Sequence, residues 1–293
     1  MRVLLLGNFG QLGWELNRTL APLGDLVAID YPEIDLRDVE SLRGMIASAH
    51  PQVIVNATAY TAVDKAESEA EIAQAINTQA PRIMAEEAQR INALLIHYST
   101  DYVFDGGKGS DYREDEVANP LNQYGRSKLA GELAIQEVDG SYLIFRTAWV
   151  YSLRRDSFVT KVLEWSRSKN SLRIVSDQVS NPTWCRMLAE ITAQLLAKGG
   201  SDVVGWLGER RGIYHLAGSG RASRFEWAQA ILEMDPRREE QTVIEIHPAL
   251  TSDFPSSAER PLHSALKCDR FRDTFGLSLP DWREALKLAM DSE

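Results

Sequence analysis

The feature that most constrains this sequence is a glycine-rich turn directly after a short apolar run at the N-terminus. The run Arg2–Leu6 is followed by Gly7-Asn8-Phe9-Gly10-Gln11-Leu12-Gly13 and then by an amphipathic helical pattern. Glycines at this spacing allow a tight turn and let a pyrophosphate approach the backbone N–H groups at the start of a helix. Glycines can recur in any turn, but their place after a strand favours a dinucleotide-binding unit.

Short β-rich runs alternate with longer helical patterns through the first half of the chain. Strands are predicted at Arg2–Leu6, Leu26–Asp30, Val53–Asn56, Leu94–Ser99 and Leu143–Arg146. Apolar residues three or four positions apart predict helices at Gln11–Ala21, Val39–Ser48, Lys65–Thr78, Ala80–Arg90 and Gln123–Gln136. This alternation is typical of an α/β fold with a doubly wound parallel (Rossmann) sheet, whose ligands bind beyond the carboxyl ends of the strands.

Beyond Trp149 the alternation loosens. Further elements are predicted as helices at Ser157–Ser168, Cys185–Ala197, Arg224–Glu233 and Trp282–Met290, and as a strand at Ile213–Leu216. Stretches rich in glycine, or bearing proline, are interpreted as loops at Gly205–Gly212 and His247–Ser257. We expect a dinucleotide-binding domain at residues 1–150, with segments near 183–220 that could return to it. A second, smaller and mostly helical substrate domain is expected over residues 151–293.

Composition and charge exclude several classes of protein. The 293 residues carry 32 basic and 42 acidic side chains, and the net charge of −10 disfavours a nucleic-acid partner. No apolar stretch approaches the roughly 18 residues of a membrane-spanning helix, and the N-terminus lacks a secretory signal, so we expect a cytoplasmic protein. The two cysteines, Cys185 and Cys268, have no zinc-binding spacing.

Three polar side chains indicate chemistry at a carbonyl group. Tyr124 and Lys128 are four positions apart on one predicted helix, so that a phenol and an ammonium share a face. A nearby cation lowers the pKa of a tyrosine, and the phenol can give its proton to a carbonyl oxygen as hydride arrives. Thr100 leaves a predicted strand at the same edge of the sheet. The alternatives are a surface helix pair and an ordinary strand-to-loop transition.

An acidic residue, Asp30, ends the second predicted strand. A carboxylate there can accept hydrogen bonds from the adenosine ribose hydroxyls of a dinucleotide, and it repels the 2′-phosphate of NADPH. The residue types alone therefore favour NADH. A solvated turn residue before Pro32 is the alternative interpretation of Asp30.

Motifs in a consistent order run through nearly the whole chain. They are Gly7–Leu16, Val53–Ala57, Thr61–Glu67, His97–Gly106, Pro120–Lys128, Phe145–Tyr151, Asp177-Gln178, Asn181–Thr183, Arg260-Pro261 and Leu279–Trp282. Together they resemble those of the extended short-chain dehydrogenases/reductases, and within them the enzymes that reduce a 4-keto nucleotide sugar. The resemblance implies reduction of the 4-keto group of dTDP-6-deoxy-L-lyxo-4-hexulose to dTDP-L-rhamnose.

The resemblance also implies roles for single residues. Tyr124 would be the proton donor, Lys128 would hold the nicotinamide ribose and tune Tyr124, and Thr100 would bind the reacting oxygen of the sugar. Sugar contacts are implied at Thr100, Asp101 and Trp149. Cofactor contacts are implied at Gly7, Gly10, Gln11, Leu12, Gly13, Asp30, Asp35, Leu36, Ala59, Tyr60, Thr61, Tyr124 and Lys128.

Cofactor choice, metal binding and assembly are further implications of the resemblance. Relatives with an acidic residue at the position of Asp30 accept NADPH, whose phosphate could turn toward Arg37 here, so we expect use of NADPH and NADH. Relatives dimerise through Mg²⁺ held by surface glutamates, which suggests a homodimer. Glu15 and Glu190 lie on predicted helices that could supply such ligands, but solvated helix faces are the more common case, and we assign no metal ligand.

Two other functions share much of this pattern. A nucleotide-sugar epimerase or 4,6-dehydratase has the same glycine turn, tyrosine and lysine, but dehydration requires a glutamate beside the aspartate, and here Tyr102 follows Asp101. A non-catalytic regulatory subunit resembling that of methionine adenosyltransferase keeps the fold to bind a partner enzyme. The presence of Thr100, Tyr124 and Lys128 favours catalysis, and turnover of a keto sugar distinguishes these functions.

Overall fold

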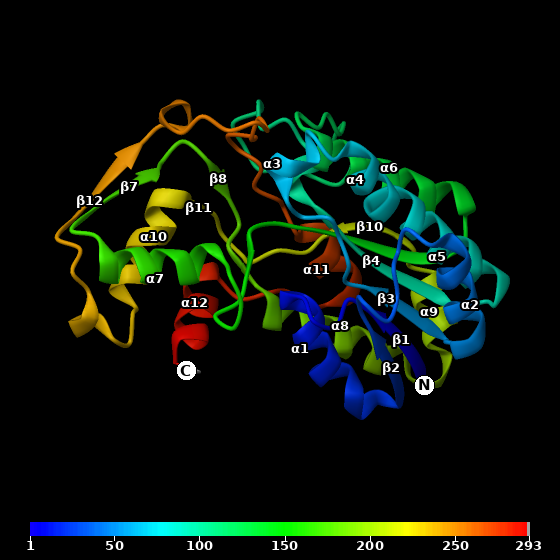
Figure 1. The fold of residues 1–293 in the computed structure, drawn as a ribbon. Helices are drawn as coiled ribbons and strands as arrows, with labels where there is room; N and C mark the ends of the chain where they lie inside the picture. Colours follow the sequence, from blue (N-terminus) through cyan, green and yellow to red (C-terminus); the bar gives the residue numbers. More distant parts are fainter. Residues whose placement is uncertain (292–293) are drawn as a thin grey trace.

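A computed structural model describes residues 1–291 and shows a larger, sheet-centred part beside a smaller part of helices and short strand pairs (Figure 1). The large part contains a six-stranded sheet in the order β10-β5-β4-β3-β1-β2, with every pair parallel. Its strands are β1 (Arg2–Leu6), β2 (Asp25–Ile29), β3 (Val53–Asn56), β4 (Leu94–Thr100), β5 (Ser141–Thr147) and β10 (Gly212–His215). The predicted doubly wound α/β fold is confirmed.

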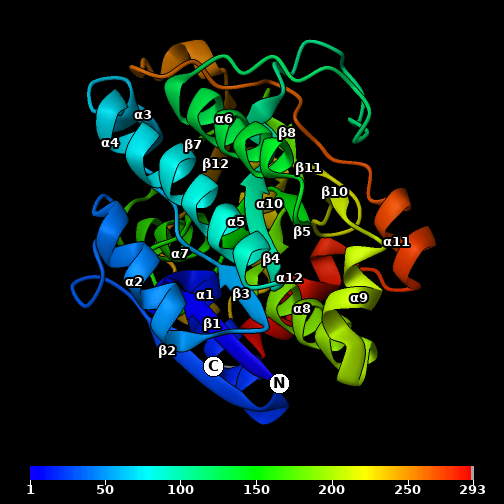
Figure 2. The same ribbon diagram turned by 90° about the vertical axis from the view of Figure 1, so that its right-hand side faces the viewer.

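The sheet separates two apolar cores. Val3 and Leu5 of β1 face one core, and Leu4 and Leu6 face the other, because successive side chains of a strand point to opposite sides. One face is covered by α1 (Gln11–Leu20) and α8 (Cys185–Gly199), and the other by α2 (Val39–Ala49), α5 (Ala80–Arg90) and α6 (Gln123–Val138). Figure 1 shows α6 on the opposite side of the sheet from α1 and α8, and Figure 2 shows α2, α5 and α6 beside one another.

The strand order places a ligand site at one edge of this sheet. From β1 the chain adds β2 on one side and then β3 and β4 on the other. Loops that follow strands on the two sides of such a switch point diverge, and they leave a crevice at the carboxyl ends.

The smaller part combines helices with three short strand pairs. Its helices are α7 (Phe158–Ser168), α10 (Arg224–Glu233) and α12 (Trp282–Met290). The pairs are β7 (Ser171–Val175) with β12 (Glu245–Ala249), β8 (Val179–Ser180) with β11 (Ala222–Ser223), and β6 (Val150–Tyr151) with β9 (Thr183–Trp184). From the second half of the chain, α8 and β10 join the large part.

Several segments differ from their predicted form. The helix expected at Lys65–Thr78 is divided into α3 (Val63–Ala66), α4 (Ala70–Gln74) and a π-helical turn at Ala75–Gln79. Part of the stretch interpreted as a glycine-rich loop is helical, as α9 (Val203–Gly208), and β12 contains the start of the other predicted loop. Another helix, α11 (Asp269–Phe275), had not been predicted. No helix within residues 1–291 has the length and apolar character needed to cross a membrane.

Candidate active site

A cavity of about 800 Å³ opens at the carboxyl ends of β1, β3, β4 and β5. The predicted residues that line it are Gly10, Gln11, Leu12, Ala59, Thr61, Thr100, Asp101, Tyr124, Lys128 and Trp149. The predicted residues that do not line it are Gly7, Gly13, Asp30, Asp35, Leu36 and Tyr60. The first set surrounds one space, whereas the second set is not part of its lining.

The glycine turn forms one end of this cavity. Gly7 has a φ of +92°, and a Cβ atom there would lie 2.8 Å from the Thr58 side chain. A Cβ atom on Gly13 would lie 1.8 Å from the Gly7 carbonyl oxygen, so this glycine allows α1 to pack against the turn. These two glycines therefore shape the turn from behind the lining residues.

The same turn has groups that fit a dinucleotide. Gly10 caps α1 without any side-chain hydrogen bond, so the first N–H groups of the helix face the cavity without a capping side chain. The buried Oδ1 atom of Asn8 and Oε1 atom of Gln11 have no hydrogen-bond partner. A pyrophosphate suits the open helix start, and a ligand hydroxyl can donate to the unpaired oxygen of Gln11, a residue that lines the cavity. The residues present thus fit a nicotinamide dinucleotide.

The loop after β3 is held against the cavity by a residue that the sequence analysis missed. Asn77, from the π-helical turn, accepts a hydrogen bond from Tyr60 N at 2.8 Å and donates to the Tyr60 carbonyl at 3.1 Å. The Tyr60 phenol donates to Glu69 on the outer side. Asn77 therefore orients the backbone between Ala59 and Thr61, and π-helical turns are frequent at functional sites.

Asp30 lies at the end of β2 and is bonded to the glycine turn. Its Oδ2 atom accepts from Phe9 N at 2.8 Å, and its Oδ1 atom accepts from Tyr31 N at 2.8 Å. Each oxygen retains a further lone pair for a ribose hydroxyl. Arg37, the expected partner for a 2′-phosphate, donates to both carboxylate oxygens of Asp35, and these bonds lower the pKa of Asp35 to about 2.

We expect the Asp30→Asn substitution to shift cofactor preference toward NADPH. The amide retains a hydrogen-bond acceptor for the turn but removes a negative charge that repels the 2′-phosphate. Repulsion between two charges near a surface amounts to a few kcal/mol before screening by salt, so the ratio of kcat/KM for NADPH over NADH should rise about tenfold. Steady-state kinetics with both cofactors measure this ratio, and an unchanged ratio would show that Asp30 does not contact the adenosine ribose.

Tyr124 enters the cavity from the first turn of α6. The helix starts at Asn122, whose Oδ1 atom accepts from Gly125 N at 2.8 Å and whose amide donates to the Glu259 carbonyl at 2.7 Å. Burial raises the pKa of the Tyr124 phenol, and a hydrogen bond with the Thr100 side chain partly offsets the rise. The phenol is therefore protonated at neutral pH and lies beside the Thr100 hydroxyl.

Lys128 differs from the expectation that it lowers the pKa of Tyr124. Its Nζ atom donates to the Tyr98 carbonyl at 2.6 Å and lies 3.2 Å from His97 Nε2, and its side chain is only 1% exposed. Burial lowers the pKa of Lys128 to about 8. Desolvation thus dominates both groups in the free chain, and it opposes the attraction between an ammonium and a phenolate.

Asp101 lies at the floor of the cavity, where its carboxylate is fully engaged by hydroxyl groups. Ser180 and Ser264 donate to its Oδ2 atom at 2.9 and 2.5 Å, and Thr100 donates to its Oδ1 atom at 3.2 Å. Burial raises the pKa of Asp101, and these hydrogen bonds oppose the rise. Since Ser180 and Ser264 come from the smaller part, Asp101 joins the two parts of the molecule behind the site.

Trp149 lies where the cavity meets the smaller part. Its backbone has a φ of +42°, a left-handed conformation that is strained for a bulky residue and is characteristic of functional sites. The indole stacks on Trp227, with ring centroids 5.5 Å apart, and the Arg224 guanidinium lies 3.6 Å from the Trp149 ring centroid. The resemblance implied a sugar contact at Trp149, and the indole both lines the cavity and packs on the core.

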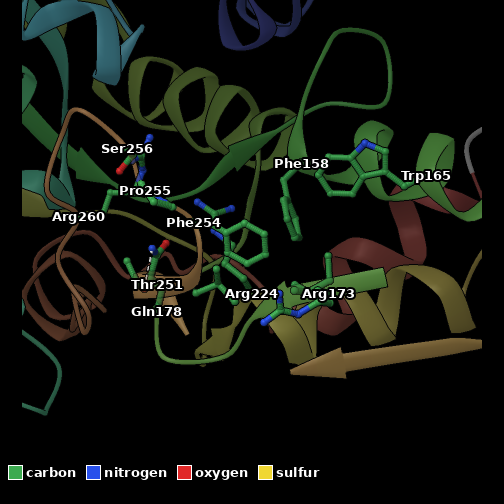
Figure 3. Close-up of a pocket in the computed structure, with 12 residues that line it drawn as sticks. Phe158, Trp165, Arg173, Gln178, Arg224, Thr251, Phe254, Pro255, Ser256 and Arg260 are labelled. Carbon is green, nitrogen blue, oxygen red and sulfur yellow. Dashed lines mark hydrogen bonds between the residues drawn. The ribbon is translucent and has the colours of Figure 1, made fainter. Parts of the chain in front are cut away.

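A second cavity, of about 360 Å³, lies next to Arg224 in the smaller part. Figure 3 shows arginine and aromatic side chains around it. The aromatic side chains are Phe158, Trp165 and Phe254, and the arginines are Arg173, Arg224 and Arg260. Sequence reasoning assigned none of them to a binding site, because they come from four separate segments of the chain.

The three arginines of the second cavity differ in their partners. Arg260 pairs with Asp64 at 2.5 Å and Arg173 with Asp253 at 2.6 Å. Arg224 forms no ion pair with an acidic side chain among residues 1–291; burial lowers its pKa, and the nearby Tyr102 and Asp101 side chains oppose this change. An arginine in that position suits an anionic ligand.

The residues considered for Mg²⁺ are engaged in ion pairs on their own helices. Glu15 pairs with Arg18 at 3.1 Å, and Glu190 pairs with Arg186 at 3.1 Å. No group of three metal-ligating side chains occurs in the described part of the chain. Nothing in this geometry assigns a metal ligand.

Comparisons with known proteins place the chain in a family. A family model described as the RmlD substrate binding domain matches residues 1–293. The dTDP-4-dehydrorhamnose reductase of Burkholderia thailandensis is 41% identical over 293 residues, which cover 99% of this chain and 98% of that protein.

Solved structures agree with this placement. The crystal structure of a dTDP-4-dehydrorhamnose reductase from Clostridium acetobutylicum matches with a TM-score of 0.91 and 30% identity, covering 100% of this chain and 99% of that one. A Bacillus anthracis enzyme of the same name, solved in complex with NADP, matches with a TM-score of 0.90 and 30% identity, with the same coverage. This chain belongs to the dTDP-4-dehydrorhamnose reductase family.

Proposed function

We propose that this protein reduces the 4-keto group of dTDP-6-deoxy-L-lyxo-4-hexulose to dTDP-L-rhamnose, using NADPH or NADH. The observation that carries the proposal is the convergence of Thr100, Tyr124 and Lys128 in one cavity with the glycine turn. A bound nicotinamide supplies the hydride. The chain itself must orient the sugar, provide a proton and exclude water.

Tyr124 is the proton donor in this proposal. The phenol retains its proton at neutral pH because burial raises its pKa. Thr100 can hold the ketone oxygen within reach of this phenol, so that the proton moves to the oxygen as negative charge develops there. Lys128, one helical turn from Tyr124, binds the nicotinamide ribose and stabilises the phenolate that forms.

The second cavity suits the nucleotide half of the substrate. Aromatic faces at Phe158 and Phe254 can stack on a base, and Arg224 can form charge-assisted hydrogen bonds with a diphosphate. Arg224 also lies against Trp149, which lines the first cavity, so the guanidinium bridges the two spaces. A nucleoside diphosphate bound here would place its sugar beside Tyr124.

We expect Arg224→Gln to raise the KM for the nucleotide sugar by about 10- to 100-fold, because hydrogen bonds to charged groups contribute about 1.5–3 kcal/mol. The KM for the nicotinamide cofactor should hardly change. Arg221→Gln is the matched control. Arg221 lies just before α10, the helix that begins with Arg224, and its exposed side chain pairs with Asp111. An equal rise in the KM for the nucleotide sugar in both variants would contradict a diphosphate contact at Arg224.

The decisive experiment incubates the purified protein with the dTDP-4-keto-6-deoxy-L-sugar and NADPH or NADH. Loss of reduced cofactor absorbance, with formation of a nucleotide-linked rhamnose by mass spectrometry, would support the proposal. No turnover, together with tight binding to a methionine adenosyltransferase, would favour the regulatory function instead. The proposal places the reaction in the cytoplasm and allows a homodimer. Sedimentation with Mg²⁺, and again with a chelator, would test whether the protein dimerises and whether the dimer depends on the metal.

The geometry around Asp101 favours reduction over dehydration. A dehydratase needs an acid and a base that exchange protons with the sugar carbons and hydroxyls. Here three hydroxyl groups bind the Asp101 carboxylate, and the next residue, Tyr102, has no carboxylate. Asp101 is thus suited to a fixed polar wall that can contact the sugar.

A further inference from the structure

A chain of buried polar groups lies behind the cavity and ends at Lys128, and its other two members, Asn56 and His97, have no part in the roles described above. Asn56 ends β3, His97 pairs with it on β4, and Lys128 extends from α6. All three residues are at most 1% exposed. Asn56 Nδ2 lies 3.0 Å from His97 Nδ1, and Lys128 Nζ lies 3.2 Å from His97 Nε2. The imidazole therefore connects the asparagine amide to the lysine.

The backbone determines the direction of these hydrogen bonds. The N–H group of Thr58, which can only donate, lies 3.0 Å from Asn56 Oδ1. The Asn56 amide must therefore turn its oxygen toward Thr58 and its NH₂ group toward His97, so that His97 Nδ1 accepts. Burial and the nearby lysine hold the pKa of His97 well below its ordinary value. The neutral ring then carries its proton on Nε2, which faces Lys128.

This arrangement opposes a positive charge on Lys128. An ammonium at Nζ and an N–H group at His97 Nε2 are both donors. The uncharged amine can instead accept from His97 and still donate to the Tyr98 carbonyl at 2.6 Å. Protonation of Lys128 therefore breaks its hydrogen bond with His97. If the imidazole instead moves its proton to Nδ1, the hydrogen bond between His97 and the Asn56 NH₂ group is broken, because both groups are then donors.

We propose that His97 is a positioning residue that holds Lys128 beside the site and weakens the binding of its proton. The inference rests on the proposed role of Lys128 in reduction. After Tyr124 has given its proton to the sugar oxygen, the phenolate must be protonated again. The Lys128 ammonium can transfer a proton to the phenolate and become an amine, which takes up another proton from solvent in the cavity.

Burial lowers the pKa of Lys128, and the other charged groups near Lys128 do not lower it further. Glu132, one turn further along α6, favours the ammonium form of Lys128. The Glu132 carboxylate is itself bound by Arg146 of β5, at 2.7 Å, and accepts a hydrogen bond from Ser99 of β4. Tyr124, one turn earlier, is an uncharged phenol at neutral pH. His97 is thus the group facing Lys128 whose hydrogen bonding discriminates between amine and ammonium.

An NMR titration of the free, full-length protein tests the proposal without substrate or cofactor. Lysine is labelled with ¹³C at Cε, and the Lys128 signal is identified by its loss in Lys128→Arg. In the wild type the signal should titrate near pH 8. In His97→Gln, whose amide oxygen can accept from the ammonium, the pKa should rise by roughly one unit or more.

Two further variants keep the test informative. Ile96→Val, one residue earlier on β4, loosens the core but leaves the polar chain intact, so Lys128 should titrate as in the wild type. Asn56→Asp retains His97 but presents a carboxylate to its Nδ1 atom. Because a carboxylate can only accept, the imidazole proton moves to Nδ1, and Nε2 presents a lone pair to Lys128. This change should also raise the pKa of Lys128, and it serves if His97→Gln does not fold.

The outcomes separate this inference from the proposed function. The role proposed for His97 is wrong if Lys128 titrates at the same pH in the wild type, in His97→Gln and in Asn56→Asp. It is also wrong if Lys128 titrates near pH 10 in the wild type. If Lys128 titrates as expected but the protein does not turn over the sugar, the proposed function fails instead. In an active enzyme, the alkaline limb of kcat should move to higher pH in His97→Gln, which a purely structural role would not cause.

Discussion

Replacing Tyr124 by phenylalanine is expected to lower kcat for the keto sugar by about 10²- to 10⁴-fold, the usual contribution of general acid catalysis. The substitution removes the hydroxyl that carries the proton and retains the ring. That ring contacts Tyr102 edge-on, with centroids 5.9 Å apart, so packing and cofactor affinity should change little. Single-turnover rates measure the chemical step, and fluorescence titration measures cofactor binding.

A matched substitution separates catalysis from general damage. Tyr142→Phe removes a phenol from β5 near the amino end of that strand, away from the cavity, and should leave kcat unchanged. Thermal melts of both variants establish that they are folded under the assay conditions. A kcat for Tyr124→Phe close to that of the wild type would exclude Tyr124 as the proton donor.

The largest effect on stability is expected from Glu132→Ala, which should lower the free energy of unfolding by about 3–5 kcal/mol. Glu132 is fully buried and accepts three hydrogen bonds from Arg146, at 3.0, 3.2 and 2.7 Å. Arg146 is itself only 4% exposed, so loss of the carboxylate leaves an unpaired positive charge between α6 and β5. Urea unfolding should show a lower midpoint with a similar slope.

A double variant tests whether the unpaired charge causes this loss. Glu132→Leu combined with Arg146→Met removes both charges and fills the space with apolar side chains, which often restores stability. We expect the double variant to be more stable than Glu132→Ala. If it is as unstable as Glu132→Ala, packing around α6, rather than the unpaired arginine, explains the loss.

Elements with a strong local signal were predicted to the residue. The bounds of β1, β3, α5, α10 and α12 are those expected from the sequence. In β3 all four residues are buried, and such short apolar runs are recognisable without knowledge of their partners. Helices α10 and α12 start after Ser223 and Asp281, whose side chains cap the first turn.

Elements that depend on a distant partner were not predicted. The strands β7 and β12 pair across more than 70 residues of sequence, and β12 contains a proline. Three of the five residues of β12 are exposed, so it shows neither an apolar run nor a regular alternation. Its β-structure depends on hydrogen bonds to β7, which no local pattern reveals.

The candidate site divides in the same way. Gly7, Gly13, Tyr124 and Lys128 stand out because each belongs to a short motif whose backbone geometry depends on near neighbours. The environment of Lys128 was not predictable, since burial raises the pKa of Tyr124 and lowers the pKa of Lys128. His97 was assigned no role from the sequence, and its bonds to Asn56 and Lys128 appear only in the folded chain.

Turn geometry and periodic burial depend on residues close together in the chain, and this made the glycine turn, the order of strands and helices along the chain and the Tyr124–Lys128 pair predictable from the sequence. The groups that surround this pair, by contrast, are brought there by the tertiary fold. Sheet order brings Asn56 and His97 together across 41 positions, and docking of the smaller part brings Ser180 and Ser264 to Asp101. Such contacts depend on how distant segments pack, and packing also sets the desolvation that controls the charges of Tyr124 and Lys128.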